Sequence, residues 1–152
     1  MKNKIKNIKP IIIVLPNNKS GSSLIKARLF NKLKKFKNIK FKIFTIKQFP
    51  LLKGFTYYFL KKYDINKFKI LKRFKNKIIY EPLDIHWNTP KYNKQFKKIF
   101  KIVNHIIFNN KSLNDLFNLN KSTIIYHEYD TRFSLNTELT DSVYYIGMKD
   151  KT

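Results

Sequence analysis

The sequence IIIVL, from Ile11 to Leu15, is followed at once by the turn-forming run Pro16-Asn17-Asn18. A short run of apolar, mostly β-branched residues that ends at a turn is typical of a strand buried on both faces. Strands of this kind occur in parallel sheets that helices cover on both sides. The run therefore predicts an α/β protein.

Segments with helical and strand-like patterns alternate on the C-terminal side of this run. We expect helices over residues 24–36, 51–63, 65–74, 93–103 and 112–117, and further strands over residues 41–46, 78–80, 106–108 and 123–126. Helix N-caps are expected at Ser22 or Ser23, at Asp64 and at Ser112, because these side chains can accept a hydrogen bond from a helix start. Strands that alternate with helices predict right-handed crossovers and a Rossmann-like parallel sheet flanked by helices.

The end of the chain differs from this alternating part. Residues 131–141 are polar and are expected to form an interdomain linker after a Rossmann-like domain over residues 1–130. Residues 142–152 begin with the apolar run Ser142-Val143-Tyr144-Tyr145-Ile146-Gly147, which is expected to form the first strand of a truncated second domain.

Composition limits the cellular setting and the chemistry. The chain of 152 residues has no cysteine, so disulfides and thiolate chemistry are excluded. Its longest apolar run, Ile11 to Leu15, is too short to span a bilayer. We expect a cytoplasmic protein that is soluble or peripheral at the inner face of a membrane.

The net charge of +24 suggests an anionic partner, but thirty of the 33 basic residues are lysines. Lysine shares A/T-rich codons with the abundant Asn, Ile, Phe and Tyr, so nucleotide bias is a rival explanation. Lysine is also poorer than arginine at bidentate phosphate or base recognition, which favours an anionic membrane over nucleic acid. The candidate membrane or anion-binding residues are Lys67, Lys69, Lys72 and Arg73, although an ordinary solvated helix face remains an equal explanation.

Three polar clusters follow predicted strands, where open parallel sheets bind ligands. The first runs from Asn17 to Ser23 and contains Gly21 and Ser22. Backbone N–H groups at the start of the following helix could face a phosphate or a sugar hydroxyl. The competing interpretation is an ordinary turn with a Ser cap, since neither the Walker pattern nor the dinucleotide-binding glycine pattern is present.

The second cluster, residues 81–88, contains two carboxylates, a histidine and the single tryptophan. Asp84 could accept a proton from an acceptor hydroxyl or orient His86 to do so, which makes both catalytic candidates. Trp87 offers an apolar platform for a sugar ring. A Pro-containing loop whose tryptophan only packs is the alternative.

The third cluster runs from His127 to Phe133. Asp130 and Arg132 are expected to pair with each other or with the linker backbone and so to fix the domain exit. His127 and Glu128 could join His86 and Asp84 at a metal, but no ligand pair with the spacing of a zinc site exists, so we expect no metal. His105 lies in an apolar stretch and is expected to be a satisfied core residue.

The order of these parts resembles the N-terminal domain of GT-B glycosyltransferases, in particular the retaining glycosyltransferase 4-like group. The resemblance rests on the stretches 11–15 with 19–23, 80–86, 105–112, 127–133 and 143–147. Asp130, Arg132 and Phe133 fit the family pattern, whereas Glu128 stands where the family usually has glycine.

The resemblance implies transfer of a sugar from a nucleotide-sugar, which is a co-substrate, to a sugar or lipid-linked acceptor. It places Asp84 and His86 near the acceptor and Gly21 and Ser22 near the sugar-diphosphate, and makes Trp87, His127 and Glu128 binding candidates. The family's donor-binding signature lies in a C-terminal domain, so a separate chain would have to supply that domain, and this chain is expected to be inactive alone. The alternatives are a non-catalytic basic module that binds nucleic acid or anionic membrane, and a truncated remnant without activity.

Overall fold

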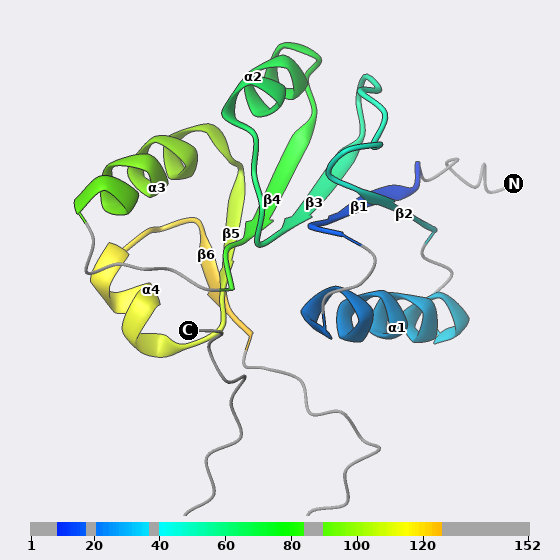
Figure 1. Cartoon of the computed structure of the whole chain (residues 1–152), viewed down its shortest axis with the longest axis horizontal. Helices are drawn as coiled ribbons and strands as arrows, with labels where there is room; N and C mark the ends of the chain where they lie inside the picture. The colour runs from blue at the N-terminus through cyan, green and yellow to red at the C-terminus, as the bar shows by residue number, and fades with distance from the viewer. Residues whose placement is uncertain (1–8, 18–20, 37–39, 84–89, 126–152) are drawn as a thin grey trace, which may run out of the picture.

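The structure is a computed structural model, and it describes residues 9–17, 21–36, 40–83 and 90–125 (Figure 1). Within these ranges six strands form one sheet in the order β2-β1-β3-β4-β5-β6, and every neighbouring pair is parallel. The strands are β1 (Ile11–Leu15), β2 (Phe41–Thr45), β3 (Thr56–Leu60), β4 (Lys77–Glu81), β5 (His105–Phe108) and β6 (Ser122–Ile124). The helices are α1 (Gly21–Phe36), α2 (Ile65–Arg73), α3 (Pro90–Ile102) and α4 (Lys111–Phe117). The predicted α/β, Rossmann-like fold is confirmed.

Helices cover the two faces of the sheet unequally. Figure 1 shows α1 on one face and α2, α3 and α4 on the other. Alternate strand residues divide accordingly, because successive side chains of a strand point to opposite faces. Ile12 and Val14 join the larger core cluster, with Phe68 of α2 and Phe100 of α3. The smaller cluster, beneath α1, consists of Ile13, Leu15, Phe30, Phe41, Tyr58, Leu60 and Leu83.

The strand order sets where a ligand can bind. The chain passes from β1 through α1 to β2 and then returns across β1 to β3, so the winding direction reverses between β1 and β3. Ligands of doubly wound sheets bind beyond the carboxyl ends of the strands, at such a reversal. All six strands are parallel, so their carboxyl ends form one edge of the sheet, here called the carboxyl edge, and their amino ends form the opposite amino edge.

The predicted helix over residues 51–63 is wrong, because Thr56–Leu60 is strand β3. This strand pairs with both β1 and β4, and four of its five residues are buried. A short apolar run has no periodicity that separates a buried strand from a helix, and Pro50 favoured a helix start. Gly54, with φ +73, makes the turn into β3 in a conformation that glycine adopts at least cost.

Two of the three predicted helix caps are wrong. Helix α1 begins at Gly21, so Ser22 and Ser23 lie inside its first turn. Helix α4 begins at Lys111 and is capped by Asn110, whose side chain accepts a hydrogen bond from the backbone N–H of Leu113, rather than by Ser112. The Asp64 cap of α2 is confirmed, because its carboxylate accepts hydrogen bonds from two backbone N–H groups at the helix start.

Among the described residues, no helix combines the length and apolar character needed to cross a bilayer. The predicted linker over residues 131–141 and the predicted second-domain strand over residues 142–152 lie outside the described residues.

Candidate functional site

Five of the eleven predicted site residues, including both catalytic candidates, lie outside the described part of the chain. Gly21 is the first residue of α1, which follows β1, and Ser22 is the next. Leu83 and Ile125 are the last described residues after β4 and β6. Asp84, His86 and Trp87 follow Leu83 in the sequence, and His127 and Glu128 follow Ile125, all beyond the described ranges.

A buried ion pair lies at this edge and was not assigned a role from the sequence. Lys26 of α1 places its Nζ 3.2 Å from Oε1 of Glu81, the last residue of β4. The side chains retain only 11% and 3% of their accessible area, so both charges are largely withdrawn from water. Withdrawal of two charges is tolerated when they are paired. The pair therefore joins α1 to the end of β4, at the carboxyl edge.

The backbone is unusual at the same place. Leu83 has φ +35 and Lys61, directly after β3, has φ +60, and left-handed conformations are costly for side chains of this size. The Asn109 amide donates to the Leu83 carbonyl at 2.9 Å, and the Tyr80 hydroxyl donates to the Lys61 carbonyl at 2.9 Å. Burial, with a smaller effect of Tyr63, raises the pKa of Tyr80, so its hydroxyl stays a neutral donor. Both strained residues are thus fixed by side chains of neighbouring segments.

A cavity of about 280 Å³ opens at the carboxyl edge between α1 and β2. Its polar groups come from Asn17, Ser23, Thr45 and Gln48. Its apolar wall consists of Leu15, Leu24, Ala27, Ile43 and Phe44. A mainly apolar cavity with a few polar groups is a common form of small-ligand site. This one lies beside the first turn of α1 through Ser23 and Leu24, and neither Gly21 nor Ser22 is among its lining residues.

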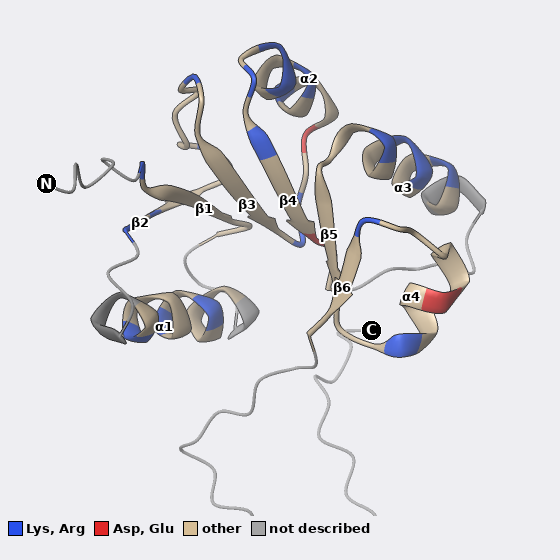
Figure 2. Cartoon of the chain, turned by 180° about the vertical axis from the view of Figure 1, so that it is seen from behind, with Lys and Arg blue, Asp and Glu red and all other residues tan. Residues whose placement is uncertain are grey.

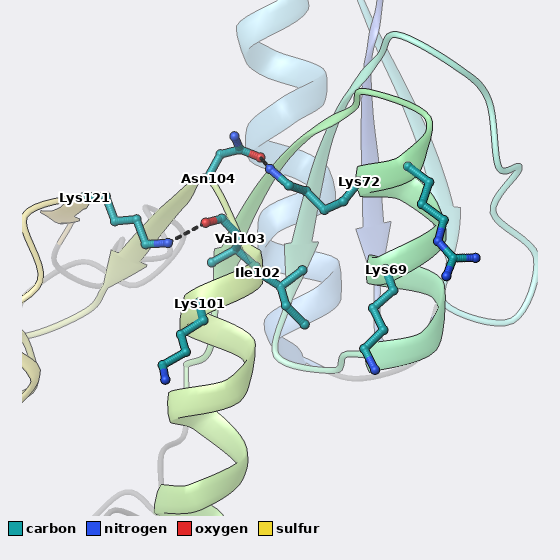
Figure 3. Close-up of a pocket in the computed structure, with 8 residues that line it drawn as sticks. Lys69, Lys72, Lys101, Ile102, Val103, Asn104 and Lys121 are labelled. Carbon is teal, nitrogen blue, oxygen red and sulfur yellow. Dashed lines mark hydrogen bonds between the residues drawn. The ribbon is translucent and has the colours of Figure 1, made fainter.

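A second and larger hollow lies at the amino edge. This basin measures about 600 Å³ and is lined by Lys69, Lys72, Arg73, Lys101, Ile102, Val103, Asn104 and Lys121 (Figure 3). Three of the four predicted anion-binding residues line it. The structure separates the fourth, Lys67, whose Nζ donates to the Ile46 carbonyl at 3.2 Å and lies 4.9 Å from the centre of the Phe49 ring.

Two of the basin lysines are held by hydrogen bonds (Figure 3). Lys72 donates to Oδ1 of Asn104 at 3.1 Å, and Lys121 donates to the Val103 carbonyl at 2.7 Å. The same Asn104 oxygen accepts the Ile78 backbone N–H at 2.9 Å, which joins the basin to the start of β4. Burial and, to a lesser extent, the charge of Lys72 lower the pKa of Lys121. Burial of Lys121 is thus the main cause of this lower pKa, and the nearby ammonium of Lys72 adds to it.

Replacing Lys72 by Gln should raise the pKa of Lys121 toward its ordinary value. Part of the shift should remain, because burial is the larger cause and is unchanged. NMR titration of the lysine Nζ resonances measures the effect, and Lys97→Gln, an exposed change on α3, is the control. An unchanged pKa of Lys121 in Lys72→Gln would show that the two charges do not interact.

Among the described residues, no three His, Asp or Glu side chains gather in a way that could hold a metal ion. His105 is half-buried on β5, and its Nε2 lies 2.8 Å from Oγ1 of Thr123 on β6. It is therefore hydrogen-bonded, as predicted, but it is not part of the buried core.

The fold and the polar groups at the carboxyl edge define an α/β protein of the Rossmann-like class with a candidate ligand site at the usual edge of the sheet. No known protein family matches the chain, and neither a curated protein nor a solved structure is significantly similar to it.

Proposed function

We propose that this chain is the acceptor-side domain of a GT-B-type glycosyltransferase, which works with a donor-binding domain to transfer a sugar from a nucleotide-sugar to an acceptor. The observation that carries the proposal is the parallel direction of all six described strands. The segments that contain Gly21, Asp84 and His127 each continue from the carboxyl end of a strand, as a shared cleft requires.

The strand order supports the division of roles. One strand, β3, separates β1 from β4, so the ends of β1 and β4 are roughly 10 Å apart at ordinary strand spacing. That distance suits a sugar held between the start of α1 and the residues after Leu83. The end of β6 lies two strands beyond β4, so His127 and Glu128 would begin farther away and contact an outer part of the acceptor.

Within the proposal each residue has a stated task. Backbone N–H groups at the start of α1, near Gly21 and Ser22, face the sugar-diphosphate, because a helix start attracts negative charge. Asp84 accepts the acceptor hydroxyl proton or orients His86 to accept it. Trp87 supports a sugar ring by apolar contact. The strained backbone at Leu83 agrees with these tasks, since such strain is concentrated at functional sites.

The test is NMR titration of the full chain, labelled with ¹⁵N, with UDP-glucose, UDP-N-acetylglucosamine and GDP-mannose and with their free sugars. We expect at least one sugar to shift the amide signals of Ser23, Leu24 and Leu83. The double variant Asp84→Asn/His86→Gln should weaken the apparent affinity for that sugar at least about tenfold, because it removes both polar partners.

Lys97→Gln/Lys98→Gln, on the exposed side of α3, is the matched control and should bind the sugar as the parent chain does. Shifts confined to the amino edge, or equal binding by the Asp84→Asn/His86→Gln variant, would contradict the proposal.

A further inference from the structure

Three large apolar side chains are exposed near the amino edge. Leu51 and Leu52 retain 37% and 40% of their accessible area, and Phe74, the C-cap of α2, retains 38%. The leucines belong to the connection that enters β3, and Phe74 belongs to the connection that enters β4. These strands are neighbours, so the two connections lie side by side. We call these three residues the apolar triad.

Hydrogen bonds fix the apolar triad in its exposed position. The Gly54 N–H donates to the Phe74 carbonyl at 3.2 Å, which joins the two connections directly. Asn76, which is 3% exposed, donates to the Leu52 carbonyl at 2.8 Å and accepts the Phe55 N–H at 2.7 Å. The Tyr57 hydroxyl accepts the Leu52 N–H at 2.8 Å. The exposure of the triad is therefore built into the fold rather than left to a loosely held loop.

Positive charge surrounds the apolar triad. Lys53, Arg73 and Lys75 are its exposed neighbours in the sequence, and Lys9 reaches the Lys53 carbonyl at 3.5 Å. Arg73 also belongs to the basin, which adds Lys69, Lys72, Lys101 and Lys121 to the same edge of the sheet. Figure 2 shows Lys and Arg distributed along α2 and α3.

Acidic residues are kept away from this surface within the described part of the chain. The acidic residues there are Asp64, Glu81 and Asp115. Asp64 caps the far end of α2, Glu81 ends β4 at the carboxyl edge, and Asp115 pairs with Lys111 on α4. Counting only the described residues, the surface thus combines apolar groups and cations with no acidic side chain beside them.

We propose that the amino edge is a docking surface for an anionic lipid bilayer, with the apolar triad inserted among the acyl chains and the surrounding lysines on the headgroups. Apolar insertion together with attraction to anionic lipids is the general basis of peripheral membrane binding. Nucleic acid would explain the charge but gives aliphatic leucines nothing to enter. The docking surface is the amino edge, whereas the proposed sugar site lies at the opposite, carboxyl edge. This inference therefore does not rest on the proposed sugar transfer.

The test is co-sedimentation of the full chain with vesicles of phosphatidylcholine mixed with phosphatidylglycerol, and with vesicles of phosphatidylcholine alone. We expect binding to the anionic vesicles and little to the neutral ones. The variant Leu51→Ser/Leu52→Ser/Phe74→Ser should bind more than about tenfold more weakly. The variant Lys72→Gln/Arg73→Gln should lose about fivefold for each charge removed and should depend less on salt.

Matched controls come from α1, on the opposite face of the sheet. Ile25→Ser removes an equally exposed apolar side chain, and Arg28→Gln/Lys32→Gln removes two exposed charges, so both should bind like the parent chain. Circular dichroism of every variant confirms that the fold is retained. The proposal would be overturned if the triad variant bound anionic vesicles as well as the control variants do. It would also be overturned if single-stranded DNA displaced the parent chain from the vesicles while the triad variant still bound them normally.

Discussion

Replacing Lys26 by Met should lower the free energy of unfolding by about 3 kcal/mol at neutral pH. The substitution preserves most of the side-chain volume but removes the Lys26 ammonium from the Glu81 carboxylate, whose side chain is 3% exposed. Removing one partner of a buried ion pair costs about 3–5 kcal/mol, because the remaining charge is withdrawn from water without compensation. We expect the lower end of that range, since Lys26 retains some contact with solvent.

Urea unfolding followed by circular dichroism measures this change. Lys32→Met is the matched control, because Lys32 lies on the same helix but is exposed, and its effect should stay within about 0.5 kcal/mol. The double variant Lys26→Met/Glu81→Gln should recover much of the loss, since it removes both charges. A loss in Lys26→Met no larger than in Lys32→Met would contradict the role assigned to the pair.

The sequence predicted the fold class because its evidence is redundant. The run from Ile11 to Leu15, the helical spacing after Ser23 and the Asp64 cap each point to strands alternating with helices. Five of the six described strands were expected. The sixth, β3, was missed because Thr56–Leu60 is a continuous apolar run preceded by Pro50 and Gly54, which fits a helix start as well as a turn.

The candidate site was less predictable than the fold, because its side-chain contacts join residues that are far apart in the sequence. Its position after β1, β4 and β6 follows from local sequence order alone. The pairing of Lys26 with Glu81 depends on α1 passing over the sheet to the end of β4, a contact between residues that are 55 positions apart, as the numbers 26 and 81 show. Similarly, the basin joins residues of α2 to residues that precede β5 and β6. Their sequence proximity grouped Lys67 with Lys72, but Lys72 lines the basin whereas Lys67 donates to the Ile46 carbonyl.

Asn76→Ala should lower the free energy of unfolding by about 3 kcal/mol, although it removes no charge and little apolar area. Both polar atoms of this 3% exposed side chain are used, one for the Leu52 carbonyl and one for the Phe55 N–H. The Phe55 N–H would lose this acceptor, and a buried group left without a partner costs about 1–3 kcal/mol. The Leu52 carbonyl would keep the Tyr57 hydroxyl, at 3.4 Å, and would lose only the stronger of its two bonds. Asn76→Asp keeps an acceptor for the Phe55 N–H but places a buried carboxylate against the Leu52 carbonyl, so it should destabilise the chain at least as much as Asn76→Ala.

The Asn76 variant also tests whether a fixed apolar triad matters for vesicle binding. Without the amide, Leu52 loses one of the bonds that hold it beside Phe74. The connection that contains Leu51 and Leu52 must then lose conformational entropy when it enters the bilayer, which weakens binding. Asn76→Ala should therefore bind anionic vesicles several-fold more weakly although every lysine and the whole triad remain. Asn66→Ala, an exposed change on α2, should alter neither stability nor binding. The amide hydrogen-exchange rates of Gly54 and Phe55 identify the cause, and we expect both to rise in Asn76→Ala. Unchanged rates would mean that the Asn76 amide does not hold the triad in place.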